Sequence, residues 1–213
     1  MSALIEPLIL YFVLFLSASV YPAPPPDLIP FSLSAELTRT FFYNIPSLAL
    51  IWYILLRTKS FRAWGAGISG LRDLPSLALT FPGMILIGVT ISAVSSFFPG
   101  IPEGPRVESP ENIPGWLVLA LSCLSTGYLE ESFFRFYLHR KLEDHGISQG
   151  KTVLVSALLF SICHIYEGPW GCLNAVLAGF LLSFIFMRFR SLHGIAFAHG
   201  LYNIFVYAAG TIG

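Results

Sequence analysis

Charged residues are scarce in this chain of 213 residues. Only 11% of the residues are Asp, Glu, Lys or Arg, whereas 55% are hydrophobic, and the mean hydropathy is +0.72. A single soluble core cannot bury so much apolar surface, so the composition excludes an ordinary water-soluble globular protein. We therefore expect an all-α polytopic membrane protein that crosses the bilayer several times and contacts membrane lipid.

Runs of one charge and paired cysteine motifs are also missing. The 12 basic and 12 acidic residues give a formal net charge of zero, and no basic cluster indicates a nucleic-acid partner. Cys123, Cys163 and Cys172 fall in apolar segments without CxxC spacing, which is typical of small buried residues and not of a disulfide framework or a zinc cluster. Since no internal repeat or soluble linker interrupts the chain, we expect residues 1–213 to form one membrane domain.

Seven apolar stretches are predicted to be membrane-spanning helices. A proline-rich segment, residues 21–30, and a polar segment, residues 99–114, separate some of them as loops. We expect residues 1–114 to form N-terminal helices and residues 115–209 to carry the polar motifs described below. The predicted spans are residues 4–20, 37–56, 74–98, 115–138, 152–165, 170–187 and 192–209.

The basic residues predict the orientation of these spans. Nine of the 12 basic residues fall in alternate connections, and the positive-inside rule places such connections in the cytoplasm. The N-terminus is then also expected to be cytoplasmic. The nine residues are Arg57, Lys59, Arg62, Arg72, Arg140, Lys141, Lys151, Arg188 and Arg190.

Three ionisable side chains interrupt the fourth predicted span. They lie in the sequence YLEESFFR, residues 128–135, and each charge at the centre of a bilayer helix costs about 2.5–3.5 kcal/mol on insertion scales. Glu131 and Arg135 are four residues apart and can form a structural ion pair. Glu130 points about 100° away from them on the helix and has no local partner. Because intramembrane ionisable residues are functional by default, Glu130 is the main candidate for chemistry.

Two histidines and one asparagine are predicted to lie near the depth of Glu130. Glu130 is about 15 Å from the basic end of its helix, His164 about 18 Å and His199 about 10 Å, at 1.5 Å per residue. Asn203 follows His199 by one helical turn, and His164 follows Phe160 by one turn. An acid, two imidazoles and an amide in a cavity shielded from lipid are suited to activating water and stabilising an oxyanion. The other histidines, His139, His145 and His193, are expected in or beside solvated loops.

These residues form three motifs in a fixed order along the late spans. They are EExxxR (Glu130, Glu131, Arg135), FxxxH (Phe160, His164) and HxxxN (His199, Asn203). In this order they resemble the CPBP family of intramembrane proteases, also called the Abi family. That family includes the CAAX prenyl endopeptidases of the Ras-converting-enzyme type. The resemblance covers residues 130–203, and before residue 130 only the hydropathy agrees.

The resemblance implies a glutamate-type endopeptidase that needs no metal or other cofactor. Glu130 is implied as the general base that activates water, assisted by His164, and His199 and Asn203 as the oxyanion site. Peptides or lipidated proteins such as prenylated CAAX tails are the implied substrates. Phe136 departs from the family pattern, in which glycine often follows the arginine, and we expect its ring to narrow the cavity. The implied supporting residues are Glu131, Arg135 and Phe160.

Alternative readings remain open from the residues alone. Glu130, His164 and His199 also make a plausible two-histidine, one-glutamate zinc site with an open position. The resemblance also implies non-enzymatic alternatives, since relatives of this family have been linked to bacteriocin self-immunity and to membrane scaffolding. In a scaffold, peptide-binding or self-immunity protein the same polar cluster would only bind a peptide or stabilise the bundle. Neither HExxH nor GxGD is present, and the sequence GISG at residues 67–70 lies in a charged connection, where we predict a loop and not a serine nucleophile.

Overall fold

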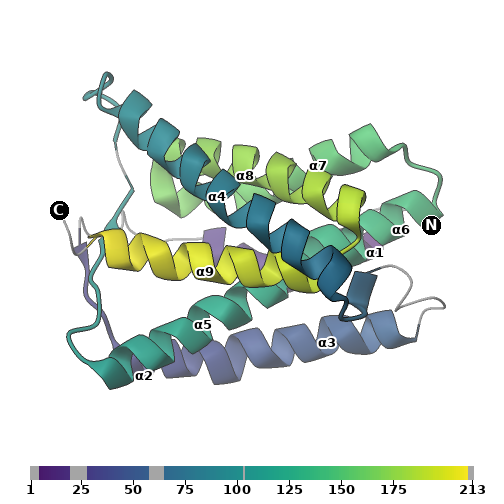
Figure 1. Cartoon of the computed structure of the whole chain (residues 1–213), viewed down its shortest axis with the longest axis horizontal. Coiled ribbons are helices and arrows are strands. Elements are labelled where there is room, and N and C mark those ends of the chain that lie inside the picture. The colour runs from purple at the N-terminus through teal and green to yellow at the C-terminus, as the bar shows by residue number, and fades with distance from the viewer. Residues whose placement is uncertain (1–4, 20–27, 58–64, 103, 211–213) are drawn as a thin grey trace.

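The computed structural model describes residues 5–19, 28–57, 65–102 and 104–210, and these residues form a bundle of helices (Figure 1). Two short strands pair in parallel at one end of the bundle, where Leu28 faces Arg106. The α-helices are α1 (Ile5–Ser19), α2 (Leu33–Thr38), α3 (Ile45–Leu56), α4 (Gly70–Ser95), α5 (Ile113–Glu131), α6 (Leu138–Asp144), α7 (Gln149–Ile162), α8 (Gly168–Phe189) and α9 (Leu192–Gly210), and the strands are β1 (Leu28–Ile29) and β2 (Arg106–Val107).

Two π-helical segments join α-helices into longer rods. Arg39–Asn44 connects α2 to α3, and Ser132–Tyr137 connects α5 to α6. Each of the seven predicted spans coincides with a helix or with one of these longer rods, and the predicted boundaries differ from the observed ones by a few residues. The sequence GISG is a loop up to Ser69, and Ser69 is the N-cap residue of α4. The interpretation of this segment as a loop and not a nucleophile turn is therefore consistent with the fold.

The predicted number of spans is only partly confirmed. Among the described residues, three helices are long and apolar enough to cross a membrane, namely Gly70–Ser95, Ile113–Asp144 and Ile165–Phe189. Two further apolar helices, Ile5–Phe15 and Gln149–Ile162, are shorter than a typical span. The all-α membrane class therefore agrees with the structure, whereas the count of about seven spans stays a prediction.

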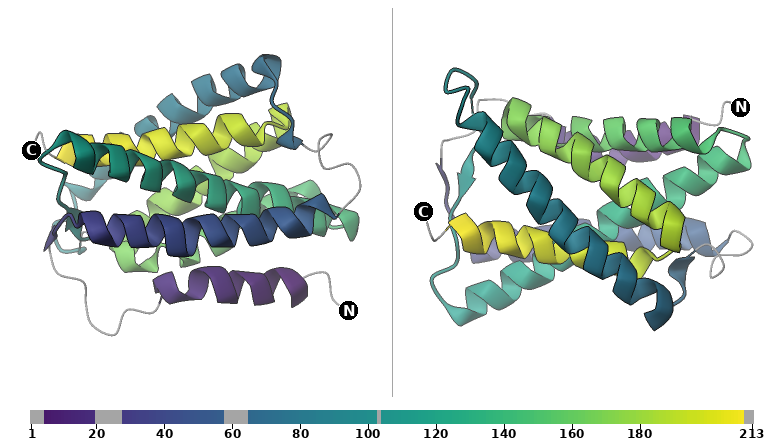
Figure 2. Two further views of the ribbon diagram at one scale, coloured as in Figure 1. Left: turned by 90° about the horizontal axis from the view of Figure 1, so that it is seen from below. Right: turned by 45° about the horizontal axis from the view of Figure 1, so that its top comes forward.

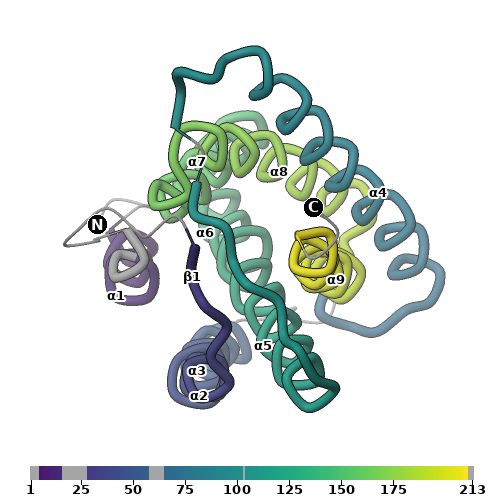
Figure 3. The backbone as a smooth tube through the Cα atoms, turned by 90° about the vertical axis from the view of Figure 1, so that its left-hand side faces the viewer, coloured from purple at the N-terminus to yellow at the C-terminus, as the bar shows by residue number. Residues whose placement is uncertain are grey.

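The helices that carry the motifs pack together in the middle of the bundle. α5 lies beside α9, and α4 crosses both α8 and α9 on one flank, while α1 lies on the opposite flank (Figures 2 and 3). The α5–α9 contact is a backbone contact at two glycines. A Cβ atom on Gly127 would lie 2.8 Å from the Gly200 nitrogen, and one on Gly200 would lie 2.8 Å from the Leu124 Cα. Only glycine permits this close approach, which carries the neighbouring His199 towards α5.

Replacement of Gly200 by alanine is expected to push α5 and α9 apart. Overpacking of this kind typically costs about 1–3 kcal/mol, so thermal unfolding in detergent should begin at a lower temperature. Gly150→Ala is the matched control, because a Cβ atom on Gly150 meets nothing within 4 Å. Equal melting temperatures for the two variants would contradict the close α5–α9 contact.

Many of the predicted basic connections lie at one end of the bundle, here called the basic end. At this end α3 finishes, α4 starts, α6 turns into α7 and α8 turns into α9 (Figure 1). Lys141 bonds Glu6 at 2.6 Å and Arg190 pairs with Glu143 at 3.5 Å. Lys59 and Arg62, also predicted there, lie outside the described residues. The opposite end, here called the loop end, holds β1, β2 and the starts of α5 and α8.

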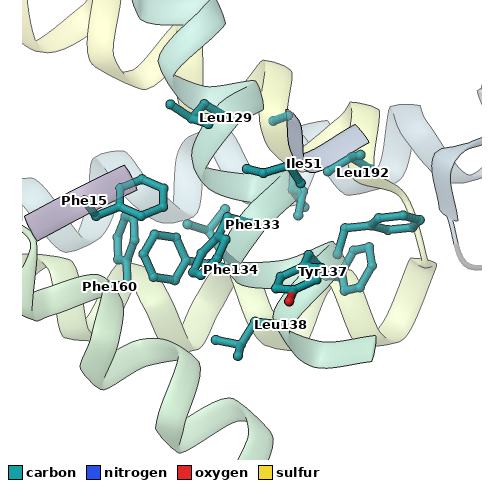
Figure 4. Close-up of a cluster of buried hydrophobic side chains, with 14 of the residues drawn as sticks. Phe15, Ile51, Leu129, Phe133, Phe134, Tyr137, Leu138, Phe160 and Leu192 are labelled. Atoms are coloured by element: carbon teal, nitrogen blue, oxygen red, sulfur yellow. The ribbon is translucent and has the colours of Figure 1, made fainter. Parts of the chain in front are cut away.

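A cluster of aromatic rings fills the core beside the motif helix. Phe15 of α1 contacts Phe133 and Phe134 at ring-centroid distances of 5.1 and 5.0 Å, and Phe134 contacts Phe160 of α7 at 5.2 Å (Figure 4). All four side chains are almost fully buried. The rings place the π-helical segment after Glu131 against α1 and α7, and thereby fix the direction in which the motif residues point.

Candidate active site

The Glu131–Arg135 ion pair lies in the interior of the bundle, as the spacing predicts. Oε1 of Glu131 is 3.2 Å from Nη1 of Arg135, and both side chains are fully buried. Arg135 also donates to the carbonyl of Gly179 on α8 at 3.5 Å, and its guanidinium lies 4.4 Å from the centre of the Phe160 ring. These contacts join α5, α7 and α8 around one buried charge pair, which supports the interpretation of the pair as structural.

His199 lies between the two adjacent glutamates of α5. Its Nδ1 is 2.9 Å from Oε1 of Glu131, and its Nε2 is 3.6 Å from Oε2 of Glu130. An ionised carboxylate only accepts hydrogen bonds, so Nδ1 carries a proton and donates it to Glu131. Glu131 therefore fixes the tautomer and direction of the ring, a contact that the sequence did not predict. The partner of Glu130, also missing from the sequence analysis, is Nε2 of His199.

His164 lies just beyond the end of α7, where the chain turns towards α8. Its Nδ1 is 2.7 Å from the carbonyl oxygen of Phe160, and because a carbonyl only accepts, Nδ1 must be the donor. The lone pair of the neutral ring is then on Nε2, which can accept a proton. The Phe160 ring lies 4.6 Å from the His164 ring and 5.9 Å from the His199 ring, between centroids. Phe160 therefore contacts both imidazoles.

All four predicted catalytic residues line one cavity. Its volume is about 810 Å³, and it extends from the centre of the bundle to the loop end, where Ile29, Pro105 and Val107 contribute to its wall. Glu131 and Arg135 are not among its lining residues and lie behind the wall. The predicted residues that the cavity brings together are Glu130, Phe160, His164, His199 and Asn203.

The charges around His199 balance when its ring is protonated. With both glutamates ionised, Arg135 compensates one carboxylate, and an imidazolium at His199 compensates the other, as buried charges require. Nε2 then carries a proton that points towards Glu130 and the cavity. The side chain of Glu130 is 13% exposed, whereas that of Glu131 is 0% exposed, so only Glu130 has access to a molecule in the cavity. The two adjacent carboxylates thus differ in burial, since Glu130 faces the cavity and Glu131 is enclosed behind its wall.

Three expectations about neighbouring residues are wrong. His139 is fully buried and not solvated, since α6 turns inwards and its ring packs edge-on against Phe186. His193 is partly buried, donates from Nε2 to the carbonyl of Ala66 and hydrogen-bonds the hydroxyl of Tyr128. Phe136 does not narrow the cavity, because its ring packs against Phe186 in the core, 6.2 Å between centroids. His145 is exposed, as predicted.

The side chains also bear on the zinc alternative. Within the described ranges, no three His, Cys, Asp or Glu side chains are grouped closely enough to hold a metal ion. Glu130, His164 and His199 line the same cavity, and Phe160 contacts both imidazoles, but the three side chains do not form such a group. The zinc alternative thus has no preformed ligand set, and a chelator experiment described in the Discussion tests it.

The sequence analysis also missed polar residues of the cavity wall. Trp170 and Asn174 of α8 and Tyr202 of α9 line the cavity together with the predicted residues. A signal was present, since Asn174 follows Trp170 by one helical turn and Tyr202 directly precedes Asn203. Without the fold, however, a single amide on an apolar helix is equally typical of helix–helix contacts.

These features define a helical membrane protein with a carboxylate and imidazole site at the base of a cavity. Residues 112–205 match the family model of the Rce1-like proteins, described as type II CAAX prenyl endopeptidase Rce1-like. The match contains all three motifs, so this part of the chain is similar to the Rce1-like family, which confirms the resemblance to the CAAX proteases. The family and the apolar helices together support an intramembrane protease. No curated protein and no solved structure matches the chain.

Proposed function

We propose that the protein is a glutamate-type intramembrane endopeptidase. The observation that carries the proposal is the position of His199 between Glu130 and Glu131, in a cavity shared with His164 and Asn203. In the proposed reaction Glu130 removes a proton from a water molecule, and the hydroxide attacks the carbonyl carbon of the scissile peptide bond. His164 assists through its Nε2, whose lone pair is directed by the Nδ1 bond to Phe160.

The remaining residues stabilise the charge that this attack creates. The carbonyl oxygen becomes an oxyanion, and we assign His199 Nε2–H and the side-chain amide of Asn203 as its hydrogen-bond donors. The tetrahedral intermediate collapses when the carbon–nitrogen bond breaks, and the proton taken by Glu130 passes to the leaving amine. The products are a carboxylic acid and an amine, and transfer of the acid proton gives a carboxylate and an ammonium group, so both protons of the water are accounted for without any cofactor. Glu131 and Arg135 act behind the site by fixing the direction of His199.

Loss of the Asn203 amide tests the proposed oxyanion site. Removal of one oxyanion donor typically lowers kcat by about 10²–10³-fold, so Asn203→Ala is expected to show this loss with a small change in KM. The measurement is peptide hydrolysis by the full chain in lipid nanodiscs. Phe205→Leu is the control on the same helix, because Phe205 is partly exposed and does not line the cavity. A wild-type rate for Asn203→Ala would exclude Asn203 from the site.

The substrate depends on which side of the membrane the cavity faces. Prenylated CAAX tails of cytoplasmic proteins are the substrates that the family name implies, but the cavity reaches the loop end and not the basic end. If the basic end is cytoplasmic, as the positive-inside rule predicts, the loop end faces the other side. In that case we infer that the substrate is a membrane-anchored peptide presented from outside the cytoplasm.

Cysteine labelling decides the orientation. Gly100 at the loop end and Gly150 at the basic end are exposed, and a side chain on either meets nothing within 4 Å. In a bacterial expression host, a membrane-impermeant thiol reagent is expected to label Gly100→Cys in intact cells and Gly150→Cys only after permeabilisation. The wild-type chain, with its native cysteines, gives the background. The reverse pattern would place the cavity mouth in the cytoplasm and favour CAAX tails.

A further inference from the structure

One face of α8 brings two unpaired polar atoms into the wall of the cavity. Trp170, Asn174 and Ala178 follow one another at single-turn spacing, and all three line the cavity. Among the described residues, Trp170 Nε1 and Asn174 Oδ1 are buried atoms without a hydrogen-bond partner. One is a donor and the other an acceptor, and neither is charged.

Unpaired polar atoms of this kind are costly unless a ligand satisfies them. A buried donor or acceptor without a partner costs about 1–3 kcal/mol, and native proteins leave few of them. Two such atoms one turn apart, both in the wall of the same cavity, therefore indicate a bound group that accepts from one and donates to the other. A peptide group does both.

The subsite is continuous with the proposed oxyanion site. The Asn174 side chain interacts with the hydroxyl of Tyr202, and Tyr202 directly precedes Asn203 on α9. The Tyr202 hydroxyl is also held close to α4, since a Cβ atom on Gly88 would lie 2.7 Å from it. α4, α8 and α9 thus fix Asn174 in relation to the residues that would hold the reacting carbonyl.

We propose that Trp170 and Asn174 form a backbone-binding subsite that holds the substrate in an extended conformation, an inference that rests on the proposed peptidase function. The indole N–H donates to a substrate carbonyl, and the Asn174 carbonyl oxygen accepts from a substrate N–H. Side chains one helical turn apart are about 5–6 Å apart at Cβ, and an extended peptide repeats its groups on one side about every 6.6–6.8 Å. The small side chains of Ala175 and Ala178, which also line the cavity, let the peptide backbone approach α8.

Two variants remove the polar atoms of one side chain each and leave an apolar side chain in its place. Trp170→Phe removes the indole donor while an aromatic ring remains beside Phe98, whose centroid lies 6.0 Å away. Asn174→Leu removes the acceptor together with the side-chain contact to the Tyr202 hydroxyl. Leu173→Ala is the control on the same helix, because Leu173 is 41% exposed and does not line the cavity. The full chains are compared in lipid nanodiscs on a proteome-derived peptide library, with products identified by mass spectrometry.

Loss of either hydrogen bond should raise KM for the best-cleaved library peptide by about 3- to 10-fold. The value of kcat should change little, because the substrate and the transition state lose the same interaction. New cleavage sites one or two residues from the original should also appear. A set of ester analogues of this peptide then replaces each N–H by oxygen in turn. One analogue should have a higher KM than the parent peptide with wild type but the same KM as the parent peptide with Asn174→Leu. A merely structural role of Asn174 does not predict this difference.

The outcomes separate the inference from the function on which it rests. In one outcome, wild type cleaves the library while both variants keep its KM, its cleavage sites and its response to the ester analogues. That result would contradict the proposed subsite and leave the proposed peptidase function intact. If wild type releases no more peptide than Glu130→Gln, the peptidase function fails and the subsite falls with it. Thermal unfolding in the same nanodiscs shows whether each variant folds, and Asn174→Ala replaces Asn174→Leu where the larger side chain prevents folding.

Discussion

Replacement of Glu130 by glutamine is expected to lower the rate of peptide hydrolysis by about 10²–10⁴-fold, the contribution of a positioned general base. Glutamine has nearly the same shape but cannot take a proton from water. The side chain lines the cavity and is partly exposed, so the substitution should change the melting temperature little. The measurement is kcat of the full chain in nanodiscs at matched protein concentration.

The control for this prediction is an exposed glutamate at the loop end. Glu111 is exposed in the segment before α5 and does not line the cavity, so Glu111→Gln should retain the wild-type rate. If Glu130→Gln hydrolyses peptides as fast as Glu111→Gln, Glu130 is not the base and the mechanism is wrong. A low rate together with a large loss of stability would instead assign Glu130 a structural role.

Replacement of Arg135 by methionine is expected to give the largest loss of stability in the chain. The guanidinium is fully buried and its removal leaves the carboxylate of Glu131 without its cation. Breaking a buried pair in this way costs about 3–5 kcal/mol, because the remaining charge stays desolvated. Thermal unfolding in detergent should therefore shift far more than for Glu130→Gln. The rate should fall as well, since Glu131 also orients His199.

A double variant distinguishes the ion pair from simple packing. In Glu131→Gln with Arg135→Met the unpaired buried charge is gone, so we expect part of the lost stability to return. Additive losses would contradict the pair as the source of the effect. Arg57→Met is the control for the loss of an arginine, because Arg57 is exposed at the end of α3 and should change the melting temperature little.

Much of the site was predictable because intramembrane charges have few alternatives. The four-residue spacing of Glu131 and Arg135 predicted their ion pair, which the structure contains at 3.2 Å. Counting residues from the basic end brought His199 near the depth of Glu130, and the structure places these side chains 3.6 Å apart. Both predictions need only the helix rise and a membrane boundary.

The contacts of His199 were not predictable in the same way. They depend on where α5 and α9 cross, and this position is set by the backbone contact of Gly127 with Gly200. Glycine in an apolar helix does not by itself reveal its partner helix. The sequence therefore predicted the pair of Glu131 with Arg135 but not the contact of Glu131 with His199. Through this contact the ion pair holds the His199 ring in place.

His139 shows where hydropathy counting failed. It precedes Arg140 and Lys141 in the sequence, and basic residues usually mark the end of a span, so a solvated position was expected. The structure instead continues the helix through a π-helical segment into α6 and turns His139 towards Phe186. The predicted position of His164 differs from the observed one only slightly. It lies past the end of α7, yet its bond to the Phe160 carbonyl preserves the predicted one-turn relation.

Peptide release from membranes tests the central claim most directly. Membranes that carry wild type, Glu130→Gln or His164→Ala at matched expression are compared by mass spectrometry, each with and without a zinc chelator. The account predicts peptides that are released by wild type, persist with chelator and disappear in both variants. Release lost on chelation would favour the zinc alternative, and equal release from wild type and Glu130→Gln would contradict the peptidase and favour a scaffold, peptide-binding or immunity role.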